Sequence, residues 1–167
     1  MNNDRLTLGS LFDGSGGFPL GGVLCGIEPV FASEIEPFPI RVTTKRFPNM
    51  IHFGDVTKLN GTVLPPVDII TFGSPCQDMS IAGKRAGLDG SRSNLFYEAI
   101  RIVKEMRYAT NGKYPRFIVW ENVPGAFSSN KGADFKAVLE SVCSVKADSI
   151  SIPVPTKGKW TGAGPID

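Results

Sequence analysis

Two short apolar runs, at residues 67–72 and 117–120, constrain the fold of this 167-residue chain most strongly. Each run is almost continuous, which is typical of strands that are buried on both faces in a parallel sheet. Between the two runs, apolar residues follow helical spacing from Leu95 to Met106. A strand, a helix and a strand in this order favour an α/β fold.

The rest of the chain continues the same alternation. Further strands are expected at residues 6–12, 29–33 and 50–53, and further helices at residues 19–25, 38–46 and 133–142. Strands and helices that alternate across short turns predict a doubly wound, mostly parallel sheet. Residues 149–167 contain three prolines and three glycines without a helical period, so an irregular tail is expected there.

Composition excludes several classes of protein. Hydrophobic residues make up 41% of the chain and charged residues 20%, which is a globular balance and not a disordered one. The net charge of +2 gives by itself no signal of nucleic-acid binding. No apolar run approaches the roughly 20 residues that a membrane span requires, and the N-terminus lacks the features of a signal peptide. A cytoplasmic protein without membrane contact is therefore expected.

The cysteines and the histidine limit the possible sites further. Cys25, Cys76 and Cys143 have no C-x-x-C spacing, which supports neither a disulfide framework nor a zinc knuckle. The single histidine, His52, excludes metal sites that need two histidines, so no metal site is expected. Cys25 and Cys143 fall in expected helices and are predicted to be core residues.

A glycine-rich turn at residues 12–18 (Phe-Asp-Gly-Ser-Gly-Gly-Phe) follows the first expected strand. Such a turn lets the backbone approach a ligand closely at the carboxyl edge of the sheet. Pro19 stands where the dinucleotide fingerprint requires glycine, and no P-loop Gly-Lys-Ser/Thr follows. The turn therefore predicts a ligand without a pyrophosphate, although a plain tight turn explains it equally well.

Two acids follow the next expected strands. Glu34 stands where an acid can accept hydrogen bonds from ribose hydroxyls, with Glu36 as the competing candidate and a solvated surface acid as the alternative for both. Asp55 follows the third strand and could accept a hydrogen bond from an adenine amino group. An Asx turn or a helix cap is the more common use of such an aspartate.

The segment at residues 73–77 (Gly-Ser-Pro-Cys-Gln) comes directly after a strongly apolar strand. Cys76 at this sheet edge is a candidate nucleophile, because backbone amides nearby can lower the pKa of a thiol. Glu121 ends the next strong strand and could hydrogen-bond or protonate a substrate ring, or could cap a helix before Pro124. A cysteine paired with a glutamate and no histidine favours attack on an electron-poor ring over acyl transfer.

Together these motifs resemble the cytosine-5 DNA methyltransferase family. The resemblance extends over residues 6–142, and its signatures follow the family's order: the F-x-G-x-G-G turn at 12–17, Glu34, Asp55, Pro-Cys-Gln at 75–77 and Glu-Asn-Val at 121–123. Each motif is short, but five motifs in order on the expected elements are specific. The resemblance implies a Rossmann-like, S-adenosylmethionine-dependent methyltransferase fold, of which this chain is an incomplete part.

The resemblance also implies a binding site for S-adenosylmethionine. Glu34 would hold the ribose, Ile35 would pack on the adenine and Asp55 would contact the adenine amino group. The implied cofactor-binding residues are Phe12, Gly14, Gly16, Gly17, Phe18, Glu34, Ile35, Asp55, Val56, Pro75 and Leu95.

The implied reaction is methylation of carbon 5 of a cytosine that has been flipped out of the duplex. The Cys76 thiolate would add to carbon 6 of the ring, and Glu121 would hydrogen-bond the ring nitrogen and the exocyclic amine. The loop at residues 78–92 would close over the flipped base. The implied substrate-binding residues are Ser74, Gln77, Ser80, Lys84, Arg85, Arg92, Asn122 and Val123. Ordinary loop solubility is the alternative explanation for the three cations.

The family's later motifs, namely the Q-x-R-x-R segment, the target-recognition region and the final helix, are not found here. We therefore expect residues 1–145 to be a catalytic core and residues 146–167 to be a tail that leads toward a missing C-terminal part. Double-stranded DNA and a complementary C-terminal methyltransferase chain are the expected partners. An RNA cytosine-5 methyltransferase and a non-catalytic remnant that binds cofactor or a partner are the alternatives.

Overall fold

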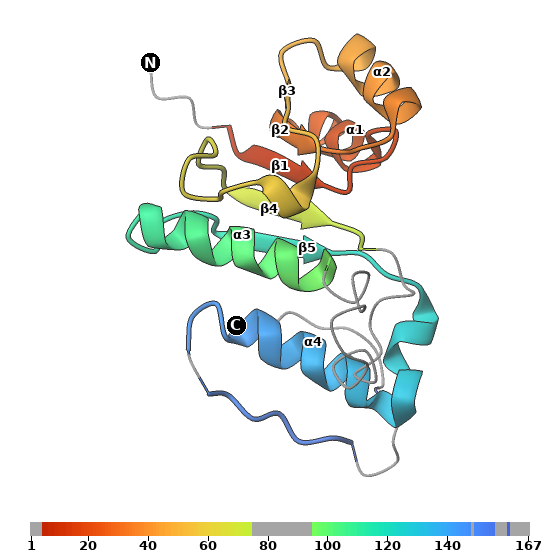
Figure 1. Ribbon diagram of the computed structural model, residues 1–167, viewed down its shortest axis with the longest axis vertical. Helices are drawn as coiled ribbons and strands as arrows, with labels where there is room; N and C mark the ends of the chain where they lie inside the picture. Colours follow the sequence, from red (N-terminus) through yellow and green to blue (C-terminus); the bar gives the residue numbers. More distant parts are fainter. Residues whose placement is uncertain (1–4, 75–94, 148, 156–159, 161–167) are drawn as a thin grey trace. The chain divides into compact units, whose positions relative to one another are not determined.

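Figure 1 shows the computed structural model of the chain, which describes residues 5–74, 95–147, 149–155 and 160. The chain divides into two compact units. Of the described residues, the first unit holds 5–74 and 97–121, and the second holds the remainder. Each unit is treated separately below.

A five-stranded parallel sheet forms the centre of the first unit. Its strands are β1 (Thr7–Leu11), β2 (Glu28–Ser33), β3 (Ile51–His52), β4 (Ile69–Phe72) and β5 (Phe117–Trp120), in the order β3-β2-β1-β4-β5. The chain runs outward from β1 through β2 to β3, and then returns to the other side of β1 with β4. The carboxyl ends of β1 and β4 therefore form the topological switch point, where sheets of this kind bind ligands.

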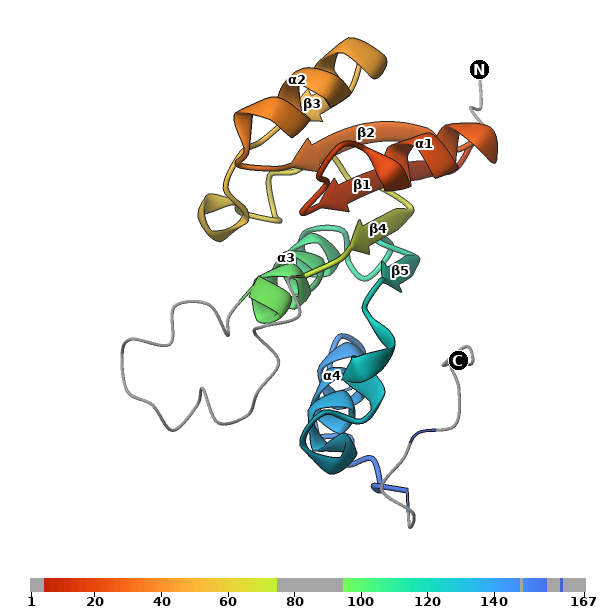
Figure 2. The same cartoon turned by 90° about the vertical axis from the view of Figure 1, so that its right-hand side faces the viewer.

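Helices cover both faces of this sheet, as Figures 1 and 2 show for α1 (Gly17–Leu24) and α3 (Leu95–Ala109), which lie on opposite sides. Right-handed crossovers require this arrangement, because β1 to β2 and β4 to β5 step in opposite directions across the sheet. The remaining helical elements of the first unit are α2 (Pro37–Arg46) and the short 3-10 helix η1 (Val56–Lys58). The predicted doubly wound α/β fold is confirmed.

The two apolar runs that predicted this fold differ in how deeply they are buried. All four residues of β4 are buried, as expected for a central strand. In β5, however, Phe117 is 51% exposed and Val119 is 43% exposed, so the prediction that this run is buried on both faces is wrong. Among the described strands β5 lies at the edge of the sheet, where only one neighbouring strand covers it.

The prediction that Cys25 is a core residue is also wrong. Cys25 is exposed and follows the last residue of α1, where its backbone N–H caps the helix by donating to the carbonyls of Gly21 and Gly22. Cys143 is half-buried at the end of α4 (Ala133–Cys143).

The second unit is built around α4, with two 3-10 helices before it, η4 (Pro124–Phe127) and η5 (Ser129–Gly132). The ring of Phe135 packs edge-on against Phe127 at 4.7 Å and against Trp160 at 5.3 Å. The indole N–H of Trp160 donates to the Gly132 carbonyl at 3.0 Å. No helix in the described parts of the chain is both long and apolar enough to cross a membrane.

Candidate functional site

Hydrogen bonds join the turns that follow β1, β2 and β3 in the first unit. The Asp13 N–H donates to the Ser33 carbonyl at 3.1 Å, and the Ser33 hydroxyl donates to the Gly54 carbonyl at 2.5 Å. The Phe53 N–H donates to the Ala32 carbonyl at 2.9 Å. The predicted glycine turn, Glu34 and Asp55 therefore stand on one connected edge of the sheet.

The glycines of the turn after β1 differ in what an added side chain would meet. Gly16 has φ +86°, and a Cβ there would lie 2.8 Å from Cγ2 of Thr43, so a larger residue would be both strained and crowded. At Gly14 and Gly17 a Cβ would meet nothing within 4 Å. Gly16 therefore brings the turn close to α2, while Gly14 and Gly17 leave open space above its backbone. Phe12, half-buried, also has a positive φ of 55°.

Glu34 links two of these turns. Its Oε2 accepts a hydrogen bond from the Gly14 N–H at 2.7 Å, and its Oε1 accepts from the N–H groups of Ile35 at 2.7 Å and Glu36 at 3.0 Å. The Glu34 carboxylate is therefore not simply a solvated surface group, because it holds the turns after β1 and β2 together. Glu36, the competing candidate, is exposed and precedes α2 without a side-chain cap.

Asp55 forms a helix cap, which the sequence analysis gave as the alternative to binding adenine. Its Oδ1 accepts from the Thr57 N–H at 3.0 Å and from the Thr57 hydroxyl at 2.8 Å, at the start of η1. The Thr57 backbone N–H is the main cause that lowers the pKa of Asp55. Oδ2 lies 3.6 Å from Nζ of Lys58. The segment is anchored further by Val56, which is buried.

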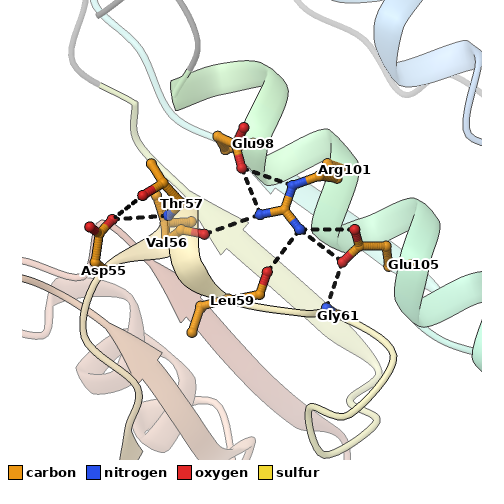
Figure 3. A network of polar contacts seen from close by, with 8 residues as sticks. All are labelled: Asp55, Val56, Thr57, Leu59, Gly61, Glu98, Arg101 and Glu105. Carbon is orange, nitrogen blue, oxygen red and sulfur yellow. Dashed lines mark hydrogen bonds and ion pairs between the residues drawn. The ribbon is translucent and has the colours of Figure 1, made fainter. Parts of the chain in front are cut away.

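Arg101 on α3 fastens this segment to the helix, as Figure 3 shows. Its guanidinium donates to the carbonyls of Val56 at 3.2 Å and Leu59 at 2.8 Å. It also pairs with the carboxylates of Glu98 at 2.6 Å and Glu105 at 2.9 Å. Burial opposes the charge of Arg101, but Glu105 and Glu98 raise its pKa. We call these five residues the Arg101 cluster.

Asp13, in the turn after β1, is a buried acid that the sequence analysis did not single out. It is 5% exposed, and neither carboxylate oxygen has a hydrogen-bond partner among the described residues. Burial raises the pKa of Asp13 to about 6; the Ser10 hydroxyl opposes this shift and the charge of Glu34 adds to it. The Ser10 hydroxyl lies near enough to favour the charged carboxylate, but the two groups do not meet the geometry of a hydrogen bond. The available signal was that Asp13 is the only charged residue between Arg5 and Glu28.

At the ends of β4 and β5, the backbone brings Gly73 against Glu121. A Cβ at Gly73 would lie 2.8 Å from Oε2 of Glu121, so the carboxylate rests over backbone that has no side chain. The Glu121 N–H donates to the Phe72 carbonyl at 3.0 Å. Ser74, which comes next, is 4% exposed, and its hydroxyl has no hydrogen-bond partner among the described residues.

The other predicted site residues of the first unit are less constrained. Ile35 is 64% exposed, and Phe18 is half-buried in the first turn of α1. In the second unit, Leu95 begins α3, Val123 is 50% exposed, and the Val123 N–H donates to Oδ1 of Asn122 at 2.7 Å. Seven predicted site residues lie outside the described residues: Pro75, Cys76, Gln77, Ser80, Lys84, Arg85 and Arg92.

The sequence of residues 6–146 matches the family model of C-5 cytosine-specific DNA methylases. The orphan methyltransferase M.SPRI of Bacillus phage SPR is 34% identical over 145 residues, which are 84% of this chain and 31% of that protein. The type II methyltransferase M1.ScrFI of Lactococcus lactis subsp. cremoris is 38% identical over 133 residues, or 79% of this chain and 32% of that protein. The chain spans about a third of the length of these two relatives.

A third relative carries a different name. The DNA N-6-adenine-methyltransferase of Escherichia phage P1 is 37% identical over 135 residues, which are 77% of this chain and 18% of that protein. Among solved structures, one assigned as a DNA modification methyltransferase encoded within an E. coli prophage superposes with a TM-score of 0.66 at 29% identity. The superposition covers 84% of this chain and 38% of that chain. The sheet described above is thus the Rossmann-like fold of methyltransferases.

Proposed function

Because this chain belongs to the C-5 cytosine-specific DNA methylase family, we propose that it forms the N-terminal catalytic part of an enzyme that methylates carbon 5 of cytosine in double-stranded DNA, with S-adenosylmethionine as the methyl donor. The observation that carries the proposal is the contact of Gly73 with the Glu121 carboxylate. That contact sets Gly73, which directly precedes the Ser-Pro-Cys sequence, beside an acid at the carboxyl edge of the sheet.

The β1–β3 edge suits the donor. The open space over Gly14 and Gly17 accommodates its amino acid end. Oε2 of Glu34 accepts one N–H and keeps a second lone pair for a ribose hydroxyl. The exposed Ile35 offers an apolar surface for adenine. Oδ1 of Asp55 takes both bonds from Thr57, and Oδ2 has only the exposed Lys58 ammonium at 3.6 Å, so Oδ2 can also accept from the adenine amino group.

The β4–β5 edge suits the base. Carbon 5 of cytosine is a weak nucleophile, so the ring must first be activated by addition at carbon 6. In the proposal the Cys76 thiolate forms a bond to carbon 6, and Glu121 hydrogen-bonds the ring nitrogen and amine, which stabilises the electron density displaced into the ring. The proposal assigns recognition of the base to Ser74, Gln77, Ser80, Asn122 and Val123, and recognition of phosphates to Lys84, Arg85 and Arg92.

The remaining steps restore the aromatic ring. Carbon 5 forms a bond to the methyl group, and the methyl–sulfur bond breaks, so S-adenosylhomocysteine leaves without the sulfonium charge. A base then removes the proton from carbon 5, and the bond between Cys76 and carbon 6 breaks to release the thiolate. The target must leave the base stack for carbon 6 to be reached.

Cytosine is favoured over adenine because the segment that follows β4 contains Cys76. Methylation of an exocyclic amine needs no addition to the ring and therefore no thiol at this position. The name of the phage P1 relative nevertheless makes adenine the alternative that the test has to separate. The division at residue 145 and a complementary C-terminal chain that supplies the recognition of DNA remain parts of this proposal.

The test uses a DNA duplex containing 5-fluorocytosine with S-adenosylmethionine. Fluorine replaces the proton that must leave carbon 5, so the reaction stops with Cys76 bound to the ring. We expect a covalent protein–DNA complex with the wild type, alone or with a complementary C-terminal chain, and none with Cys76→Ser. Cys25→Ser is the matched control, because Cys25 is an exposed thiol outside the site, and it should form as much complex as the wild type.

A second measurement identifies the product. Methyl transfer to duplex DNA and to tRNA is followed with radiolabelled donor, and the nucleosides are separated. 5-Methylcytosine in DNA supports the proposal. N6-Methyladenine, or label found in tRNA alone, would assign the chain to one of the alternatives, and no covalent complex in any arm would contradict catalysis through Cys76.

A further inference from the structure

The segment that presents Asp55 depends on contacts from outside itself. η1 is a single turn, and its backbone is closed by two hydrogen bonds, the longer of which joins the Leu59 N–H to the Val56 carbonyl at 3.2 Å. Turns of this kind have poorer hydrogen-bond geometry than an α-helix. Because Val56 is the one buried residue of η1, the backbone beside Asp55 needs a further anchor to hold one position.

Arg101 supplies that anchor by holding η1 at both ends (Figure 3). Its Nη2 donates to the carbonyl of Val56, the first residue of η1, at 3.2 Å. Its Nη1 donates to the carbonyl of Leu59, the residue after η1, at 2.8 Å. A guanidinium is planar, and its donors point in fixed directions. One side chain therefore fixes both the position and the orientation of the turn relative to α3.

The guanidinium is itself held in place on α3. Its Nε and Nη2 both donate to Oε2 of Glu98, at 2.8 Å and 2.6 Å, and its Nη1 donates to Glu105 at 2.9 Å. Together with the two carbonyls, these carboxylates give an acceptor to each of the five N–H groups of Arg101. Glu105 also accepts from the Gly61 N–H at 2.6 Å, just beyond the turn. Protein groups thus saturate Arg101, which has no donor left for a ligand.

Thr57 carries this constraint from the turn to the carboxylate of Asp55. Thr57 follows Val56 directly, and both its N–H and its hydroxyl donate to Oδ1 of Asp55, at 3.0 Å and 2.8 Å. Oδ1 therefore moves with the turn, and the turn is bonded to Arg101. Since the two carboxylate oxygens belong to one planar group, the direction in which Oδ2 faces is set as well. That direction matters, because hydrogen bonds weaken steeply when the donor and the acceptor are misaligned.

We propose that Arg101 is a positioning residue for donor recognition, and that it acts through η1 by placing Oδ2 of Asp55 where the adenine amino group arrives. This inference rests on the proposed use of S-adenosylmethionine and on the proposed contact of Asp55 with its adenine. Arg101 then determines how strongly the enzyme selects adenine over a purine that lacks the amino group. It adds little to the binding of the rest of the donor, which the proposal assigns to the turns after β1 and β2.

The test compares the affinities of the full chain for S-adenosylhomocysteine and for S-inosylhomocysteine by calorimetry. The second ligand carries an oxygen in place of the adenine amino group, so it has nothing to donate at that position. We expect the wild type to bind the adenine ligand about 10- to 100-fold more tightly, the range for a hydrogen bond to a charged group. Arg101→Gln should reduce this ratio about 5- to 10-fold by weakening the binding of the adenine ligand alone.

Two further variants separate positioning from stability. Arg107 lies on the same helix and also donates to a backbone carbonyl, that of Pro115 at 2.8 Å, so Arg107→Gln is the matched control and should keep the wild-type ratio. Arg101→Lys keeps a positive charge between Glu98 and Glu105 but lacks the planar fork that reaches two carbonyls. It should unfold at a temperature closer to that of the wild type than Arg101→Gln does, and should still reduce the ratio as much.

A double variant checks that Arg101 acts through Asp55. Asp55→Asn alone should reduce the ratio, and Arg101→Lys in that background should reduce it no further. An unchanged ratio in Arg101→Lys, or an equal loss of affinity for both ligands, would overturn the positioning role and leave the proposed function intact. An additional loss in the double variant would do the same. A wild type that binds both ligands equally would contradict the Asp55 contact and with it the inference, whereas one that binds neither would contradict the proposed donor site as well.

Discussion

The Arg101 cluster and the Asp13 turn are two charged regions of one unit that treat their charges in opposite ways. In the Arg101 cluster the guanidinium has two carboxylates and two carbonyls as partners, and Oε2 of Glu105 also accepts from the Gly61 N–H at 2.6 Å. At Asp13, one carboxylate is buried with neither oxygen bonded among the described residues.

The difference distinguishes charges whose partners the fold supplies from a buried charge that has none among the described residues. A paired cluster lowers the free energy of the folded state or leaves it unchanged, whereas an unpaired buried carboxylate raises it. Sites often keep such unfavourable groups because binding requires them. The comparison therefore predicts that removing charge will have opposite effects on stability in the two regions.

The largest effect is expected at Arg101. Arg101→Ala leaves Glu98 and Glu105 without their counter-ion and frees two carbonyls, so the free energy of unfolding should fall by about 3 kcal/mol. Lys104→Ala removes an exposed cation from the same helix and should change stability by less than about 0.5 kcal/mol. Urea unfolding measures both. A loss below about 1 kcal/mol for Arg101→Ala would remove the contrast between the two regions.

At Asp13, removing the charge should increase the free energy of unfolding instead of lowering it, and the size of the increase should depend on pH. The pKa of Asp13 is raised from 3.8 to about 6, so between these pH values the folded state binds a proton that the unfolded state has released. The stability of the wild type consequently falls as pH rises through this window. Asp13→Asn lacks this loss, and its gain over the wild type should be absent below about pH 4 and complete above about pH 6.

The size of that gain follows from the shift. Raising the pKa of Asp13 from 3.8 to about 6 corresponds to a loss of roughly 3 kcal/mol in the free energy of unfolding at high pH. Because the Asn amide is also a buried polar group, the expected gain of Asp13→Asn is about 2 kcal/mol. Unfolding curves of both proteins at several pH values between 3 and 8 give the difference directly. A gain that does not change with pH would mean that the carboxylate of Asp13 does not carry the effect.

The sequence was sufficient for most of the fold, because apolar runs and helical spacing follow directly from burial in a parallel sheet. It failed for β5 and Cys25. Phe117 and Val119 belong to a run as apolar as β4, but their exposure depends on which strands and helices lie beside them. A local pattern does not contain that information.

The sequence indicated which residues form most of the candidate site, but not their hydrogen bonds or their burial. Glu34 was expected at the edge of the sheet, but its three backbone N–H donors could not be read from spacing. Asp55 forms the cap that was its common alternative, and a cap occupies only one carboxylate oxygen. Asp13 was missed because an aspartate in a glycine turn is ordinary in sequence. That its carboxylate has no hydrogen-bond partner among the described residues is visible only in the structure.

The smallest predicted effect concerns Ser10, whose hydroxyl opposes the upward shift of the Asp13 pKa. Ser10→Ala removes a buried hydroxyl that has no hydrogen-bond partner among the described residues, so stability at pH 4 should change by less than about 0.5 kcal/mol. Without the hydroxyl the charged form of Asp13 is less favourable, and the pH window in which stability falls should extend upward. Combined with Asp13→Asn, the same change should have one small effect at every pH. A pH-dependent effect in that double variant would show that Ser10 acts on another group, and the unpaired charge at the switch point would then not be Asp13 alone.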